Sequence, residues 1–345
     1  MSVLKSQLKI AGSANMPDID GTTTGGAVNF ANKVVFQDIT PTGLLDYVSE
    51  SASDSSGVVL TVSGRDSTGV IQTEAKTLNA TTKVAGAQSF ERLLKVVASG
   101  TTAAGTIAVL SHTAVVAAHT ALAGSAATST LDATVTLASG DGAAIAAGDI
   151  FRPTNNLPSG VNFQLREIIN ISGDVVSVSA DWAIVPTSAT TYDIYQGMLL
   201  DKLPNQITQV RRPFYNAAAD VSGGSTRSFH EKVFAVDNNT VTALTVANII
   251  KQVDPSSGTL NFALTNALND TSTIATRQTV PSVAITAFSS GTAPQTIAVP
   301  SPQNLPSGGA PNAAGAQGIW LQLVLTAGLA PAKTSFTMRI SGQTT

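Results

Sequence analysis

The chain has 345 residues, of which 43% are hydrophobic, 12% charged and 5% aromatic, and the charged share is about half that of an ordinary soluble domain. A net charge of −3, a pI near 5.6 and the lack of basic clusters beyond Arg211 and Arg212 argue against specific binding of nucleic acid. Because cysteine is absent, disulfides, thiolate metal sites and a cysteine nucleophile are excluded.

The length predicts two or three domains. The first residues lack the apolar segment of a signal peptide. The longest Ala-rich stretch, residues 113–127, is interrupted by His119, Thr and Ser. We therefore expect no membrane span, and a chain that folds in the cell that makes it.

Residues 1–40 are predicted to form an extended N-terminal arm. The segment 16–26 is dense in Gly, Thr, Pro and Asp and shows no hydrophobic periodicity. Segments of this kind are often ordered only against another subunit, so we expect the arm to contact a neighbouring chain. Residues 34–36 are predicted to begin the first strand.

Residues 41–130 have the pattern of a β-sandwich domain. In the segment 58–62 every second residue is Val or Leu, which places these side chains on one face of a strand. Turns rich in Gly, Ser, Asp and Asn follow at intervals typical of a sandwich. Further strands are predicted at 70–77, 90–97 and 105–110.

Residues 131–203 are predicted to form a small β-barrel-like domain. Its clearest element is a hairpin in which 166–171 and 175–182 are joined by a Ser-Gly-Asp turn. Strands are also predicted at 148–151 and 191–195.

Residues 204–345 again have the pattern of a β-sandwich domain. A stretch rich in Pro, Gly and Ser covers 281–311, and so long a loop is typically functional or packed on a partner. Short helices are admitted only at 89–94 and 247–251. Strands are predicted at 232–236, 241–246, 260–264, 295–299, 318–325 and 335–340.

The predicted fold class is therefore all-β: two β-sandwich-like domains with a small β-barrel-like unit between them and an extended N-terminal arm. The expected boundaries are 1–40, 41–130, 131–203 and 204–345. No fixed-period repeat is present, which argues against a propeller or a solenoid.

The histidines do not form a recognisable site. His112 and His119 are seven residues apart, and on a strand this spacing places them on opposite faces, so a metal pair is not expected. His230 adjoins Glu231 and Lys232 and is interpreted as part of a solvated strand edge. No phosphate-binding loop, nucleophile elbow or His-Glu-x-x-His motif is present. We predict no catalytic, cofactor-binding or metal-binding residues, and no enzymatic activity.

Two further features are interpreted as structural. Asp18 and Asp20 could bind a hard cation such as Ca²⁺, but the other ligands of a loop motif are missing, so they are assigned to a solvated arm. Trp182 and Trp320 alternate with apolar residues and are assigned to a core or an interface rather than to sugar stacking.

Several segments resemble sequences of virion structural proteins of tailed bacteriophages. The resemblance is carried by residues 53–69, 76–96, 211–216, 231–239 and 318–342. It implies a particle component, such as a capsid-decorating (cement) protein or a head–tail (neck) protein, whose partners are copies of itself and other virion proteins. The chain would then be found in the virion, after assembly in the host cytoplasm.

The leading hypothesis is therefore a virion structural protein that binds its neighbours through the arm and the β-domain surfaces. A surface this poor in charge is easier to understand if neighbouring subunits cover much of it. One alternative is a carbohydrate-binding or adhesive β module of a tail fibre. Another is a hydrolase with a carboxylate pair brought together only in the fold.

Overall fold

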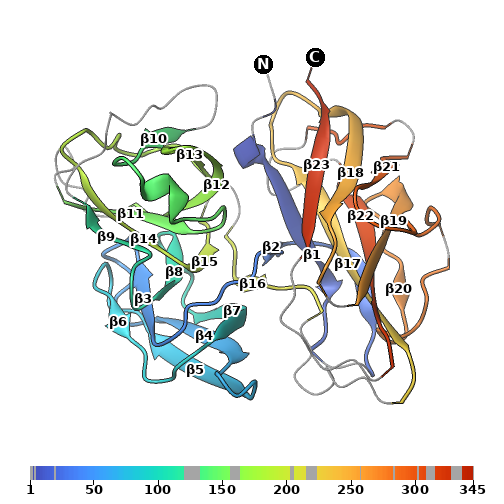
Figure 1. The fold of residues 1–345 in the computed structure, drawn as a ribbon, viewed down its shortest axis with the longest axis horizontal. Helices are drawn as coiled ribbons and strands as arrows, with labels where there is room; N and C mark the ends of the chain where they lie inside the picture. Colours follow the sequence, from blue (N-terminus) through green and yellow to red (C-terminus); the bar gives the residue numbers. More distant parts are fainter. Residues whose placement is uncertain are drawn as a thin grey trace. The chain divides into compact units, whose positions relative to one another are not determined.

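The computed structural model describes residues 3, 5–18, 21–119, 133–155, 164–202, 206–214, 224–256, 258–282, 284–300, 303–307, 315–327 and 336–344. Within these residues the fold is nearly all β (Figure 1). The helices described are two three-residue 3-10 turns, η1 (Lys5–Gln7) and η2 (Asp141–Ala143). The all-β fold class predicted from the alternating strand faces is confirmed.

The chain divides into two units. The first comprises Met1–Val3, Gln7–Asp38 and Arg211–Thr345, and the second comprises Leu4–Ser6 and Ile39–Val210. The chain returns from the second unit to the first within β16 (Gln209–Arg211). The boundary that we expected at 130 falls outside the described residues.

The first unit is a β-sandwich. Its larger sheet has the antiparallel order β19-β22-β17-β1-β2, with β20 paired to β2, and its smaller sheet has the order β21-β18-β23. The strands of this unit are β1 (Leu8–Asn15), β2 (Thr24–Val34), β17 (Arg227–Asp237), β18 (Thr245–Val253), β19 (Thr259–Leu268), β20 (Thr273–Ile274), β21 (Gln295–Ala298), β22 (Gln317–Leu325) and β23 (Thr337–Gln343).

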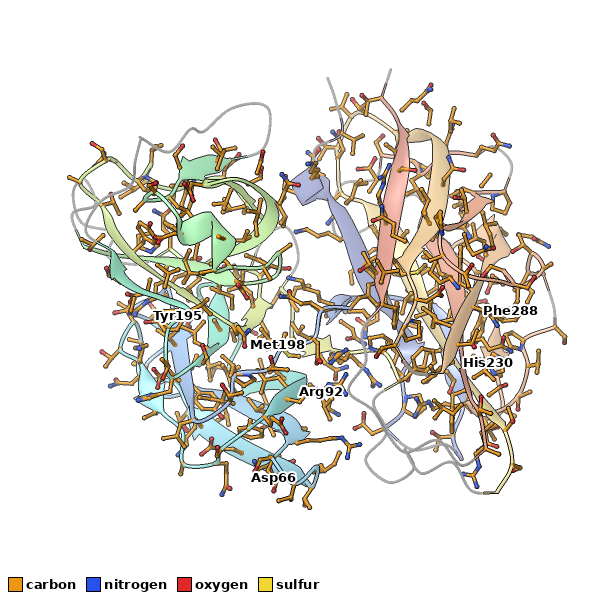
Figure 2. All side chains as sticks on the ribbon, in the orientation of Figure 1. Asp66, Arg92, Tyr195, Met198, His230 and Phe288 are labelled. Atoms are coloured by element: carbon orange, nitrogen blue, oxygen red, sulfur yellow. The ribbon has the colours of Figure 1, made fainter. Side chains whose placement is uncertain are left out.

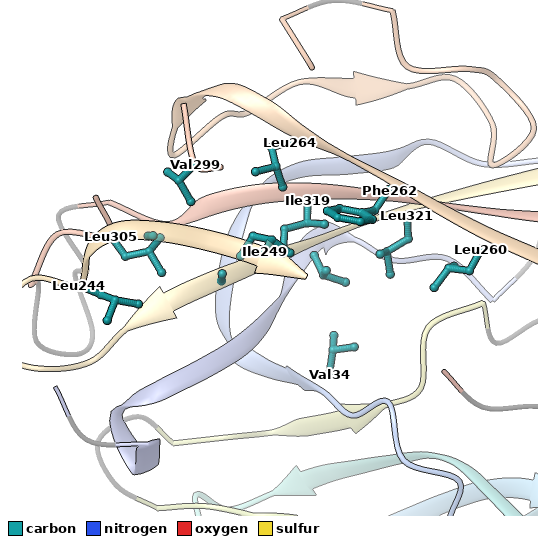
Figure 3. Close-up of a cluster of buried hydrophobic side chains, with 13 residues drawn as sticks. Val34, Leu244, Ile249, Leu260, Phe262, Leu264, Val299, Leu305, Ile319 and Leu321 are labelled. Atoms are coloured by element: carbon teal, nitrogen blue, oxygen red, sulfur yellow. The ribbon is translucent and has the colours of Figure 1, made fainter. Parts of the chain in front are cut away.

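A buried apolar cluster joins the two sheets of the first unit (Figure 3). Phe262, Ile319 and Leu321 come from the larger sheet, and Ala247 and Ile249 come from β18 of the smaller one. All five are at most 2% exposed. Alternate residues of β18 and β22 supply this core, as their two-residue periodicity requires.

The second unit contains three groups of strands. β7, β4 and β5 pair in that order, β15-β8-β3-β6 form a four-stranded sheet, and β10-β13-β12-β11-β14-β9 form a six-stranded sheet that curls like half a barrel. The strands are β3 (Leu45–Ser49), β4 (Val58–Arg65), β5 (Ile71–Thr77), β6 (Val84–Ala85), β7 (Arg92–Gly100), β8 (Ile107–Ser111), β9 (Val116–His119), β10 (Thr134–Thr136), β11 (Ile150–Asn155), β12 (Arg166–Ser172), β13 (Val175–Val178), β14 (Thr191–Tyr195) and β15 (Gly197–Leu200).

The six-stranded sheet encloses an aromatic core. Phe151 stacks on Tyr192 at a centroid distance of 5.2 Å and meets the edge of Trp182 at 5.5 Å. The predicted hairpin is present as β12 and β13, with Ser172 opposite Val175.

The prediction that the N-terminal arm packs against a neighbouring chain is corrected, because Gln7–Asp38 belong to the first unit. Much of residues 1–40 is extended, but β1 lies between β17 and β2 inside the larger sheet of the first unit, with Ile10 opposite Ala235. The glycines that suggested turns allow close packing instead. Gly25 has φ +95°, and a Cβ at this position would lie 2.7 Å from Cη2 of Trp320.

The long Pro/Gly/Ser stretch also folds back onto its own unit. Its first part covers the outer edge of β19 through backbone hydrogen bonds that join Ala284, Thr286 and Ser289 to the strand. Its middle forms β21, which pairs with β18. The interpretation of this stretch as an element that reaches towards neighbouring subunits is therefore corrected.

Both helices admitted from the sequence are strands. Residues 247–251 belong to β18, in which Ala247, Ile249 and Lys251 are buried with a period of two between β21 and β23. Residues 92–94 of the other segment belong to β7. Pairing on both sides of β18 outweighs its weak helical tendency.

Candidate functional site

The half-exposed His112 lies in a cluster of ionisable groups of the second unit. It follows β8, and its Nδ1 lies 2.8 Å from Oδ1 of Asp46 on β3. The Asp46 side chain is only 3% exposed, whereas that of His112 is 53% exposed. A buried carboxylate thus orients an accessible imidazole, an arrangement that sequence spacing could not reveal.

Lys83 extends this cluster towards a second sheet. Its Nζ lies 2.8 Å from Oδ2 of Asp46 and donates to the Tyr195 hydroxyl at 3.3 Å. Tyr195 in turn donates to Asp193 at 2.8 Å. Burial disfavours the charge of Lys83, but the hydrogen bond and charge of Asp46, together with Tyr195, outweigh it and raise its pKa. Burial, followed by the bond to Asp193, raises the pKa of Tyr195.

The chemistry of this cluster is limited to proton exchange and hydrogen bonding. General-base catalysis would need a nucleophile within hydrogen-bonding reach of the imidazole. Within the described residues the His112 imidazole contacts Asp46, and no hydrogen bond joins it to a serine or threonine hydroxyl. His119 ends β9, in a different sheet from β8, so the two histidines do not share a strand.

The interpretation of His230 as part of a solvated edge is wrong. His230, Glu231 and Lys232 are all 0% exposed, because β17 is a central strand whose two faces are both covered. His230 contacts the Arg277 carbonyl through Nδ1 at 3.1 Å and Gln322 through Nε2 at 3.2 Å, and it lies 5.8 Å from the Phe288 ring (Figure 2). Burial lowers its pKa.

Glu231 is the centre of a buried charge network in the first unit. Its Oε1 lies 3.1 Å from Nη2 of Arg277 and 3.5 Å from Nη2 of Arg211, and its Oε2 accepts from the backbone N–H of Phe214 at 2.7 Å. Both arginine side chains are 1% exposed. Arg211 also meets Asp18 at 3.3 Å, so Asp18 is ion-paired, whereas Asp20 lies outside the described residues.

The two buried lysines of this unit are each held by backbone carbonyls and by one carboxylate, that of Asp270 for Lys232 and that of Asp254 for Lys251. Lys232 donates to the carbonyls of Asp270 at 2.7 Å and of Gly26 at 3.2 Å, pairs with the Asp270 carboxylate, and lies 5.6 Å from the centre of the Trp320 ring. Burial lowers its pKa. Lys251 donates to the Leu260 carbonyl at 2.7 Å. These ammonium groups serve to join strands and loops within the core.

Burial of charge is a general feature of the chain. Of the 19 Lys and Arg and 22 Asp and Glu, fifteen are buried among the described residues. Charged side chains are rarely buried unless they are paired. The fifteen buried charged residues are Asp46, Asp54, Glu74, Asp141, Asp149, Arg152, Arg166, Asp201, Arg211, Arg212, Glu231, Lys232, Asp237, Lys251 and Arg277. The surface is therefore even poorer in charge than the composition suggests.

Two of these buried carboxyl groups should make stability depend on pH. Asp149 and Asp237 are at most 2% exposed, and in each one oxygen accepts a backbone N–H while the other has no partner among the described residues. Burial raises the pKa of each to about 6. The folded state therefore holds these protons more tightly than the unfolded state does.

Each group should make the free energy of unfolding fall as pH rises from about 4 to 6, by up to about 3 kcal/mol. His230, whose pKa burial lowers, acts in the opposite direction in the first unit. Asp237→Asn should remove the dependence due to Asp237 in the first unit and stabilise that unit above pH 6, as measured by urea unfolding across pH. Asp174→Asn is the control, because hydrogen bonds from the N–H groups of Gly140 and Gly142 lower the pKa of Asp174. That substitution should cost stability at neutral pH. A free energy of unfolding that is no higher for Asp237→Asn than for the wild type above pH 6 would contradict the expectation.

Neither tryptophan provides a surface for sugar stacking. Trp182 is 5% exposed within the half-barrel core, and Trp320 is 0% exposed in β22. Their assignment to a core agrees with these positions.

No group of three or more His, Asp or Glu side chains in the described part of the chain is arranged to hold a metal ion. Within the same residues no helix is long and apolar enough to cross a membrane. In comparisons with known proteins the chain matches no family model, no curated protein and no solved structure.

Proposed function

We propose that the chain is a structural subunit of a tailed-bacteriophage virion, either a capsid-decorating protein or a neck protein. In this role it binds copies of itself and other virion proteins through the surfaces of its β-domains. The N-terminal segment is not assigned to this binding, because β1 and β2 are part of the sandwich of the first unit.

The proposal is supported by the distribution of charged side chains between the interior and the surface of the chain. The chain has half the usual share of charged residues, and at least fifteen of them are inside the fold. Among the described residues, the exposed positions are mostly Ser, Thr, Asn, Gln, Ala and Gly. An isolated soluble protein depends on surface charge to resist association. A surface of neutral hydrogen-bonding groups is suited to contacts with other subunits instead.

We assign the chain no catalytic chemistry. Among the described residues the His112 cluster holds an oriented imidazole with no nucleophile hydrogen-bonded to it, and Glu231 is held between two arginines. The resemblance of residues 53–69 and 318–342 to phage virion proteins supplies the choice of particle.

Quantitative mass spectrometry of purified virions tests the proposed function. The chain should be present in a fixed ratio to the major capsid protein, and this ratio should persist after repeated gradient purification. A decorating protein should approach the copy number of the capsid subunit, whereas a neck protein should match a single ring. Absence of the chain from purified particles would refute a virion role.

A further inference from the structure

We propose that β23 pairs edge to edge with β23 of a second copy of the chain, antiparallel and across a two-fold axis. The smaller sheet of the first unit would then continue from one copy into the other. This inference rests on the proposed function, because it names the partner and the contact through which the subunit assembles.

Among the described strands, β23 is a long edge of the smaller sheet of the first unit. In the described residues it pairs with β18 alone, so its other side presents backbone N–H and C=O groups. Such an edge is a template for pairing with another chain. By contrast, the outer edge of β19 is covered by Ala284, Thr286 and Ser289. The opposite edge strand β21 has only four residues and lies between Pro294 and Pro300.

The core holds β23 in a conformation ready for pairing. Phe336, Met338 and Ile340 pack against the apolar cluster of the sandwich, and Phe36 lies 5.0 Å from the Phe336 ring. The strand is therefore fixed along one face while its outer edge pairs with no other described strand. Little ordering would be needed before a second strand adds to it.

β23 itself carries neither lysine nor proline, and the two register shifts in its ladder with β18 place the extra residues on β18. Natural edge strands commonly carry lysine, proline or a bulge that blocks a partner. β23 has the sequence Thr-Met-Arg-Ile-Ser-Gly-Gln, and Arg339 is its single charge. The outer face of the same sheet adds Asn248, Thr296 and Ala298, which are uncharged.

The strand is also complementary to itself. A two-fold axis at Ile340 sets Arg339 opposite Ser341 of the second copy and Met338 opposite its Gly342. No charge then faces a like charge, and the long methionine side chain faces the residue that has none. Directly opposed side chains are the contacts that decide whether two antiparallel strands pair.

Opposite charges introduced at Ser341 test this register. In the proposed dimer, Ser341→Glu sets two carboxylates opposite the two Arg339 side chains, whereas Ser341→Arg sets arginine against arginine. The dissociation constant of the full-length dimer, measured by sedimentation, should fall about three- to tenfold for S341E and rise by a similar factor for S341R. The same charges at Thr296, on the same sheet face but on β21, should change it less than twofold.

The outcomes separate the edge contact from the virion role. If the wild-type chain associates but S341E and S341R shift the constant in the same direction, or not at all, the β23 contact is refuted and assembly uses another surface. If the wild-type chain is monomeric at every concentration, the inference is also refuted. In either case, the presence or absence of the chain in purified virions decides separately whether the proposed function stands.

Discussion

Replacing Glu231 with Gln should lower the free energy of unfolding of the first unit by about 3–5 kcal/mol. Glu231 is 0% exposed and lies between Arg211 and Arg277, each 1% exposed at the side chain. Without the carboxylate, the two buried guanidinium groups lose the acidic partner that they share, and Arg211 retains its ion pair with the more exposed Asp18. The loss reflects this desolvation and exceeds the net contribution of the ion pairs themselves.

Asp18→Asn is a matched control because it changes a carboxylate on the same arginine. Asp18 lies 3.3 Å from Arg211, but its side chain is 36% exposed, so its loss should cost less than about 1 kcal/mol. Denaturant unfolding in a Trp182→Phe background would follow Trp320, which belongs to the first unit. Equal losses for the two variants would show that burial does not govern the Glu231 network.

The strand faces could be predicted from the sequence because alternation is a local property. The hairpin of β12 and β13 and the apolar face of β22 need only neighbouring residues to be recognised. The half-barrel character of the middle region also followed from short strands and turns. The predicted boundaries at 40 and 203 lie close to the divisions after Asp38 and Val210.

The burial of β17 was missed although its sequence carries a signal. Phe229 and Val233 lie on one face, and Phe234 and Val236 lie on the other, which is typical of a strand covered on both sides. The three consecutive polar residues 230–232 obscured this pattern. Their partners, such as Arg277 for Glu231 and Asp270 for Lys232, are brought to them only by the fold.

The His112 cluster illustrates the same limit in the second unit. Asp46 and His112 are 66 residues apart, and Lys83 and Tyr195 are 112 apart. No local spacing rule connects such residues, because the sheet order sets their proximity. The prediction for the N-terminal segment failed for a different reason. Its glycines suggested turns, but they allow close packing against Trp320 and Asn32.

Deleting residues 1–33 should unfold the first unit and leave the second folded. The deletion removes β1 and nearly all of β2, and β1 is the strand that pairs with β17 along Leu8–Gly12. It also removes Ala11, Val28 and Phe30, which pack on Phe234 and Val236. The loss of so much pairing and core exceeds the total stability of a typical domain, about 5–15 kcal/mol.

The two tryptophans report on the two units separately, because Trp320 lies in the first and Trp182 in the second. In the truncated chain, Trp320 emission should shift to that of a solvated indole while Trp182 emission stays that of a buried one, as read from matched Trp→Phe variants. Removal of residues 1 and 2 alone is the control and should leave both unchanged, since it keeps Val3, which packs on the core, and β1 begins at Leu8. A synthetic peptide spanning residues 5–38 should restore the Trp320 signal, because it supplies both missing strands. A truncated chain that keeps Trp320 buried without the peptide would mean that β1 and β2 are dispensable, and that this segment is free to act as an arm.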